Sequence, residues 1–207
     1  MSTKEKIFAC ALDLFSKKGF NGVSMRDIAK KVGIKGSSIY NHYAGKKAIM
    51  DDICETFVKT LAFSRPPFQE VEQMLNQMDA AELFKSLIIS YGKRIDKSWT
   101  QMARIIFSEH FYNEEAKQIF MNELIEKNVS YYESVLSIME QKQKIRACDK
   151  HVIAVLFNNE QIMLSIQYAH CETDADRAEV AHLMMTSADY LFQNLETGQI
   201  ERQNSEE

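Results

Sequence analysis

A short stretch of polar side chains near the N-terminus offers groups that suit the reading of nucleic acid. Between positions 35 and 42 a lysine is followed by hydroxyl, phenol, amide and imidazole groups. Such groups exchange hydrogen bonds with base edges and phosphates, and an aromatic ring adds a contact surface for bases. Ile39, in their midst, is expected to point into a small core. The candidates for base or phosphate contact are Lys35, Ser37, Ser38, Tyr40, Asn41 and His42.

Motifs of catalysis and of metal binding are missing from the sequence. It contains no phosphate-binding loop, no GxSxG elbow and no HExxH helix. His110 follows Glu109, and His170 precedes Cys171, but adjacent helical residues point in different directions and no partner at i+4 completes a metal site. The four cysteines lie far apart without a CxxC pair, so we expect reduced, mostly buried thiols. We expect no enzymatic activity, no cofactor and no metal.

Charge is distributed unevenly along the chain. The whole sequence carries a net charge of −4, but residues 1–47 hold ten Lys or Arg and three acidic residues, which gives +7. The rest holds 15 basic and 26 acidic residues, which gives −11. A basic head on an acidic body fits phosphate contact by the head, although a merely solvated basic surface would have the same composition.

Localisation is predicted from apolar stretches. The sequence has no uncharged apolar run of about 18 residues or more, and its start lacks the apolar core of a secretion signal. We therefore expect a cytoplasmic protein that makes no contact with membranes.

Two crossed helices are needed to hold the polar candidates against a duplex. An apolar stripe predicts a first helix over 4–18, with Ser2 and Glu5 at capping-box spacing and Gly19 as its stop. A second helix opens at Ser24, with Asp27 three residues later, and closes at Gly33, and a third helix is expected over 36–43. The turn between them is only a few residues long, so the third helix must cross the second. This arrangement is a helix-turn-helix.

The remaining sequence predicts a larger helical body. With only two prolines and seven glycines, the chain has few residues that break helices. A joining helix over 46–64 is interrupted by Pro66 and Pro67, and a short helix is possible after them. Further helices are expected over 79–97, 100–111, 113–143, 149–169 and 174–196. We predict an all-α fold with a helix-turn-helix domain over 1–47, a larger helical domain over 48–198, and a disordered tail over 199–207.

The run FACALDLFSKKGFNGVSMRDIAKKVGIKGSSIYNHYAGKKAIM resembles the DNA-binding region of the TetR/AcrR family of bacterial transcription regulators. The shared elements, in order, are LFSKKGF, VSMRDIAKKVGI, SSIYNHY and the Gly45-Lys46 start of the following helix. By this resemblance, Arg26 and Lys46 match positions that commonly contact DNA. Lys35 stands where the family often has a helix-capping serine, and Gly36 weakens the helix start, so no base preference is transferred.

The resemblance implies a homodimeric repressor on a roughly palindromic stretch of double-stranded DNA, with 48–198 as a helical effector-binding and dimerisation domain. Family members dimerise through their last two long helices, here about 149–169 and 174–196. The apolar faces suited to this contact are Val152, Leu156, Ile162, Met163 and Ile166 on the first helix, and Val180, Leu183, Met184, Ser187 and Leu191 on the second. Ala178, Ala181 and Ala188 would permit close approach. Ordinary monomer core would show the same periodicity.

A small, largely apolar effector is also implied by the resemblance. The candidate lining residues are Trp99, Met102, Phe107, His110, Tyr131 and Phe157, which could equally fill a solid core. Two other functions therefore remain open. One is a DNA-bound structural or interaction protein of the same fold with no small-molecule effector. The other is a helical metabolite-binding dimer that has lost DNA binding.

Overall fold

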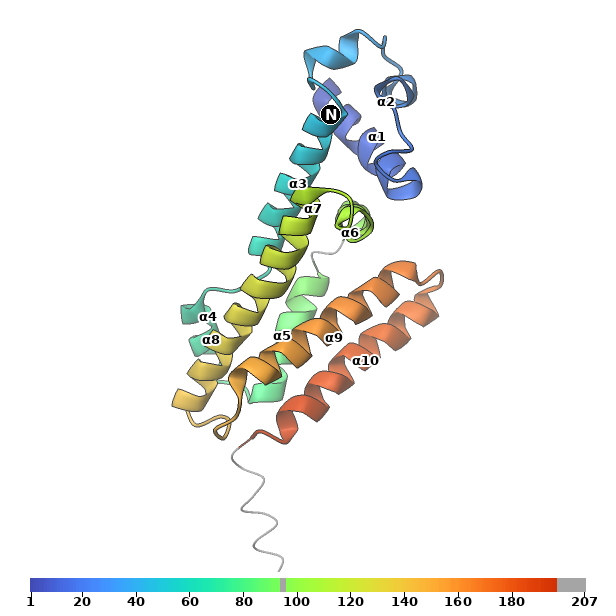
Figure 1. Ribbon diagram of the computed structural model, residues 1–207. Coiled ribbons are helices and arrows are strands. Elements are labelled where there is room, and N and C mark those ends of the chain that lie inside the picture. Colours follow the sequence, from blue (N-terminus) through green and yellow to red (C-terminus); the bar gives the residue numbers. More distant parts are fainter. Residues whose placement is uncertain (94–95, 197–207) are drawn as a thin grey trace, which may run out of the picture. The chain divides into compact units, whose positions relative to one another are not determined.

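The protein is described by a computed structural model that covers residues 1–93 and 96–196 (Figure 1). Its regular elements are helices, and extended pairing within these residues is limited to one bridge between Ile145 and Glu196. The all-α prediction is confirmed. The chain packs as two compact units. Unit 1 takes its described residues from 1–63 and 96–123, and unit 2 takes them from 64–93 and 124–196.

Unit 1 contains the predicted helix-turn-helix and three further helices. Its elements are α1 (Thr3–Lys18), α2 (Met25–Val32), the 3₁₀ helix η1 (Ser38–Asn41), α3 (Lys46–Ala62), α6 (Lys97–Glu109) and α7 (Glu114–Gln118). Helix α1 packs against α2, α3 and α6, and its buried side chains are Ile7, Ala11, Leu12 and Phe15. Compact packing thus extends past residue 47, where we drew the boundary of the DNA-binding domain. That boundary stays a functional prediction.

The first two helices begin with the predicted capping boxes. Ser2 and Glu5 exchange side-chain and backbone hydrogen bonds at the start of α1, and Ser24 and Asp27 do the same for α2. These bonds satisfy amides that would otherwise lack partners at a helix start. Gly33 ends α2 in the left-handed region at φ 81° and ψ 31°, which a residue without Cβ adopts at low cost.

The third helix is shorter than predicted. We expected a helix over 36–43, whereas the structure has a 3₁₀ helix over Ser38–Asn41 only. Ser37 precedes it without capping it through its side chain, and the Ser38 amide bonds to the Lys35 carbonyl three residues back. Gly36 lowers helix propensity at this start, which agrees with the shortening.

Unit 2 is a bundle around an aromatic core. Its helices are α4 (Phe68–Met74), α5 (Ala80–Gly92), α8 (Lys127–Gln141), α9 (Lys150–His170) and α10 (Asp174–Gln193). Helix α9 packs against α8 and α10, and α10 also packs against α5. In the core, the Phe84 ring stacks on Phe192 with centroids 3.8 Å apart and meets Phe157 edge-on at 4.7 Å.

Three further predicted helices differ from the structure. The helix predicted over 79–97 ends early, at Gly92, and the helix predicted over 100–111 starts early, as α6 at Lys97, where Asp96 accepts a hydrogen bond from the Trp99 amide. The predicted helix over 113–143 begins with Asn113 as its cap but contains a π-helical segment, η2 (Ile119–Glu126), between α7 and α8. The predicted tail over 199–207 lies outside the described residues. Among the described helices, none combines the length and apolarity needed to cross a bilayer.

Candidate nucleic-acid interface

Two buried side chains anchor the polar segment that follows α2. Ile39 has no exposed surface, and Tyr43 is 5% exposed. The amides of His42 and Tyr43 both bond to the Ile39 carbonyl, which closes the segment just beyond η1. Because these two anchors point inward, the residues between and before them are turned toward solvent.

The predicted contact residues form an exposed polar surface. Arg26, Lys35, Ser37, Tyr40, Asn41 and His42 are exposed, and Ser38 and Lys46 are half-buried. The Tyr40 ring is 56% exposed, although a large aromatic ring is usually covered. Within the described residues, none of the six exposed side chains has a hydrogen-bond or ion-pair partner. Their donors and acceptors are therefore free to meet an external molecule.

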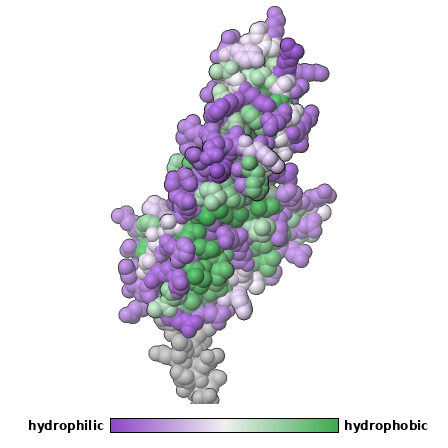
Figure 2. Space-filling model, in the orientation of Figure 1, coloured by the Kyte–Doolittle hydropathy of each residue, from purple (hydrophilic) through white to green (hydrophobic). Residues whose placement is uncertain are grey.

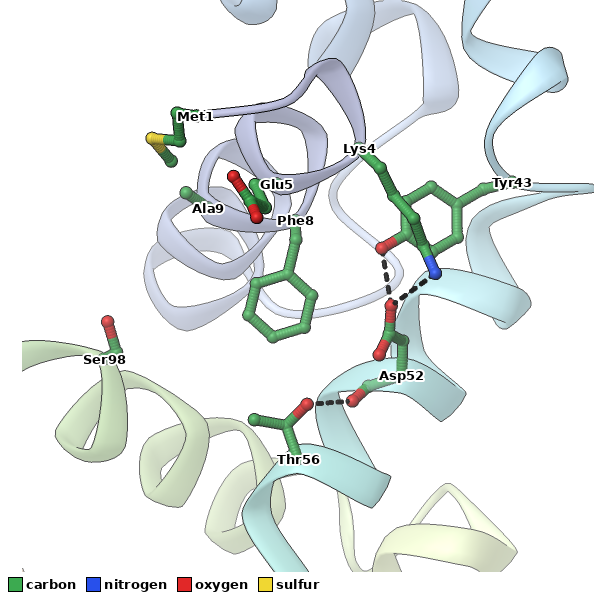
Figure 3. Close-up of a pocket in the computed structure, with 9 residues that line it drawn as sticks. All are labelled: Met1, Lys4, Glu5, Phe8, Ala9, Tyr43, Asp52, Thr56 and Ser98. Atoms are coloured by element: carbon green, nitrogen blue, oxygen red, sulfur yellow. Dashed lines mark hydrogen bonds and ion pairs between the residues drawn. The ribbon is translucent and has the colours of Figure 1, made fainter. Parts of the chain in front are cut away.

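Tyr43 is held by charged neighbours on two helices. Its hydroxyl donates to Asp52 Oδ2 at 2.6 Å, and Lys4 Nζ lies 3.5 Å from the same oxygen (Figure 3). Burial, together with the Asp52 carboxylate, raises the pKa of Tyr43, so this phenol keeps its proton. Phe8 points into a cavity of about 460 Å³ beside this group. The end of the polar segment is thus fixed to α1 and α3.

Ion pairs within unit 1 reduce the number of lysines available to phosphates. Lys17 and Lys31 both pair with Asp13, and these contacts hold the pKa of Asp13 at about 2. Lys4 pairs with Asp52 as described, and Lys47 pairs with Asp51 at 2.7 Å. Half or more of the basic residues among positions 1–47 remain outside such pairs, and Arg26 and Lys35 are among them.

Lys46 is placed differently from the other candidates. Its Nζ donates to the Phe20 carbonyl at 2.7 Å and lies 4.2 Å from the centroid of the Phe20 ring. The ammonium is therefore turned toward the α1–α2 loop. The start of α3 has no side-chain cap, because Gly45 precedes it. Its first amides are open to an external acceptor.

The six effector candidates are divided between the two units. Trp99 and Met102 are buried on α6, where the Trp99 ring contacts Phe57 at 5.6 Å. On the same unit, Phe107 and His110 pack against the Phe120 ring. Phe157 lies in the core of unit 2, and the Tyr131 hydroxyl donates to the Pro66 carbonyl. None of the six lines the cavity beside Phe8 or a second cavity of about 460 Å³ next to Cys54 and Glu115.

One polar group of the body went unnoticed in the sequence. The side-chain nitrogen of Gln161, on α9, is buried and lacks a hydrogen-bond partner within the described residues. A buried donor without a partner costs about 1–3 kcal/mol. Hydrophobic periodicity could not have identified this buried amide, because Gln161 lies on α9 next to both exposed residues and apolar residues.

Metal and thiol chemistry find no support in the geometry. In the ranges 1–93 and 96–196, no group of three or more His, Cys, Asp or Glu side chains could hold a metal ion. The four cysteines are free, but only Cys54 is buried, whereas from the sequence we expect most of them to be buried. Cys10, Cys148 and Cys171 are partly exposed. Burial raises the pKa of the Cys54 thiol to about 12, so this group stays protonated and unreactive.

Comparison with known proteins agrees with this geometry. Residues 7–53 match a family model described as "Bacterial regulatory proteins, tetR family". The HTH-type transcriptional repressor KstR2 of Rhodococcus jostii is 26% identical over 141 residues, which is 66% of this chain and 63% of that protein. The negative regulator IcaR of the icaADBC biofilm operon in Staphylococcus aureus is 48% identical over 48 residues, 23% of this chain and 26% of that protein. The match thus spans less than two thirds of either relative.

A solved structure shows the same fold over nearly the whole chain. The ketosteroid transcriptional regulator KstR2 of Mycobacterium tuberculosis superimposes with a TM-score of 0.69 at 15% identity, covering 95% of this chain and 96% of that one. The family expectation drawn from the N-terminal motifs is confirmed. Residues 7–53 are thus similar to the N-terminal region of the TetR family of bacterial regulatory proteins, and the described chain shares the fold of a solved transcriptional regulator.

Proposed function

We propose that this protein is a homodimeric repressor of transcription that binds a roughly palindromic operator in double-stranded DNA. The observation that carries the proposal is the exposed polar surface of Arg26, Lys35 and residues 37–42, whose exposed side chains have no partner within the described residues. Exposed, unpaired groups of this kind suit contact with base edges and phosphates. Repression, rather than activation, is supported by the names of the relatives KstR2 and IcaR. A protein with this task works in the cytoplasm, where bacterial DNA lies.

The proposed dimer contact is an apolar face of α9 and α10. Val152, Leu156 and Met163 on α9 and Leu183 on α10 are each about half exposed or more. The three on α9 follow helical spacing along one face. Figure 2 shows hydrophobic side chains gathered on unit 2, in the region where Figure 1 draws these helices. Met184 and Ala188, which we had assigned to this face, are instead buried within the monomer.

Selection of duplexes from a random library tests the DNA-binding part of the proposal. The purified chain should enrich a two-fold symmetric sequence whose half-sites are about 34–36 Å apart, one helical turn. Replacing Arg26 or Lys35 by alanine should make the slope of log affinity against log salt concentration shallower by about 0.9 for each phosphate that the variant no longer neutralises. Lys97, an exposed lysine on α6, supplies the matched control and should leave the slope unchanged when replaced. Absence of any enriched duplex would contradict the proposal.

Release by a small, largely apolar effector is the finer part of the proposal. The unpartnered Gln161 amide supports it, because an effector with an acceptor oxygen would satisfy that donor. The effector must bind the DNA-free form more tightly than the bound form, since equal affinity shifts nothing. A ligand panel in a thermal-shift assay tests this, starting with steroid ketones because of the name of one structural neighbour. A true effector raises the melting temperature and also weakens DNA binding.

The same regulator without an effector is the second candidate. The observation in its favour is Phe157, which is 1% exposed and packed among other rings in the core of unit 2. A filled core leaves this side chain no surface to offer a ligand. If no ligand of the panel raises the melting temperature of the chain, while DNA binding persists, this second function is favoured.

A further inference from the structure

The loop between α1 and α2 is held at one residue from three helices. The Phe20 amide donates to Glu109 Oε1, on α6, at 2.8 Å. The Phe20 carbonyl accepts from Lys46 Nζ, on α3, at 2.7 Å. The Phe20 ring packs edge-on against Phe15, on α1, with centroids 5.4 Å apart. All of these groups belong to unit 1.

The contact from α6 is a charge-assisted hydrogen bond with little access to water. Glu109 is 8% exposed, although a glutamate is seldom buried. Hydrogen bonds to an ionised acceptor are shorter and about twice as strong as neutral ones. Gly19 lets the chain turn next to Glu109, because its φ of +70° is one that a residue without Cβ adopts at low cost. The loop is therefore fitted to the carboxylate.

The contact from α3 uses the charge of Lys46 inside the protein. Its ammonium bonds to the loop carbonyl and lies over the Phe20 ring at 4.2 Å, a distance at which cation–π attraction acts. A lysine that binds a phosphate needs its ammonium turned outward. Arg26 and Lys35, by contrast, are exposed and without partners within the described residues.

We infer that Lys46 and Glu109 are positioning residues, which clamp Phe20 and so fix the direction in which α2 and the polar segment leave α1. The Lys46 ammonium binds the loop carbonyl rather than a phosphate, and Arg26 and Lys35 supply the phosphate contacts. This inference rests on the proposed DNA-binding function for its effect on affinity. The clamp itself exists in the free protein and can be measured there.

Salt dependence separates a positioning lysine from a phosphate-binding one. Lys46→Met keeps the aliphatic stem and removes the charge, and it is compared with Arg26→Ala on the duplex that the unmodified chain selects. We expect Lys46→Met to weaken binding about tenfold with an unchanged slope of log affinity against log salt. Arg26→Ala should lower the slope by about 0.9 per head, or about 1.8 for a dimer. A fall of that size with Lys46→Met overturns the inference.

Hydrogen exchange tests the clamp without DNA. Exchange of the Phe20 amide, followed in peptides over residues 19–23, should accelerate about tenfold in Lys46→Met and in Glu109→Leu, since each removes a bond that holds this residue. Glu109→Gln keeps an acceptor oxygen and should restore slow exchange, which also guards against a general failure of folding. Unchanged exchange in both Lys46→Met and Glu109→Leu would overturn the clamp. A chain that selects no duplex refutes the proposed function, and the exchange result still decides the clamp.

Discussion

Replacing Leu156 by alanine should weaken the proposed dimer while leaving the monomer intact. Complete burial of a leucine side chain contributes about 1.5–3 kcal/mol. Leu156 is 54% exposed, so the contact would cover roughly half of it, worth about 1 kcal/mol in each copy. Two-fold symmetry uses the residue twice, which makes about 2 kcal/mol. The dissociation constant of the dimer should then rise roughly 30-fold.

Sedimentation equilibrium, or subunit exchange between labelled chains, measures this change. Ile89 on α5 is the matched control, because it is an aliphatic residue of similar exposure, 46%, outside the proposed face. Ile89→Ala should leave dimerisation unchanged. Neither variant should change the unfolding free energy of the monomer, measured by urea denaturation, by more than about 0.5 kcal/mol. Leu156→Glu, which would bury an unpaired charge at the contact, should abolish the dimer. A dimer that tolerates both Leu156 variants would refute our assignment of this face.

Three further substitutions probe single contacts. Asp13→Asn removes the ion pairs to Lys17 and Lys31. Because the pKa of Asp13 in the folded protein is about 2, below its ordinary 3.8, the difference in unfolding free energy between the unmodified chain and the variant should be complete above pH 4 and vanish as the pH falls through 2. Urea unfolding at a series of pH values measures this difference. Gln161→Met replaces an unpartnered buried donor by an apolar chain and should raise the unfolding free energy by about 1 kcal/mol, while abolishing the response to any effector found; a destabilised variant would speak against an unsatisfied amide. Tyr43→Phe removes the bond to Asp52 and should cost about 1.5–3 kcal/mol in thermal unfolding, with weaker DNA binding, whereas unaltered stability would show that this bond contributes nothing.

Much of the head could be predicted from the sequence because its signals are local. Ser2 with Glu5, and Ser24 with Asp27, specify helix starts through contacts three residues apart, and Gly33 specifies a left-handed stop. All three were predicted and found. The length of the third helix was not predicted correctly. Gly36 lowers helix propensity and Ser37 makes no side-chain cap, and both favour a short 3₁₀ helix over an α-helix, which hydrophobic periodicity does not report.

Features that depend on distant residues escaped prediction. The role of Lys46 depends on Phe20, 26 positions earlier, and the partner of the Phe20 amide is Glu109, 89 positions later. Without the fold, the sequence shows Lys46 only as a charged side chain that is available to DNA. In the same way, Met184 and Ala188 share the spacing of the exposed apolar residues on α10 but are covered within unit 2. Periodicity marks an apolar face without saying which molecule covers it.

The polar segment that follows α2 contains two kinds of residue, and this has an evolutionary consequence. Ile39 and Tyr43 hold the segment in place from beneath, while the side chains of Ser37, Tyr40 and Asn41 form no hydrogen bond within the described protein. Surface substitutions at such positions usually alter folding energy by less than about 0.5 kcal/mol. If these side chains contact bases as we propose, one copy can acquire a new target sequence after gene duplication through a few exchanges at these positions while its fold remains intact.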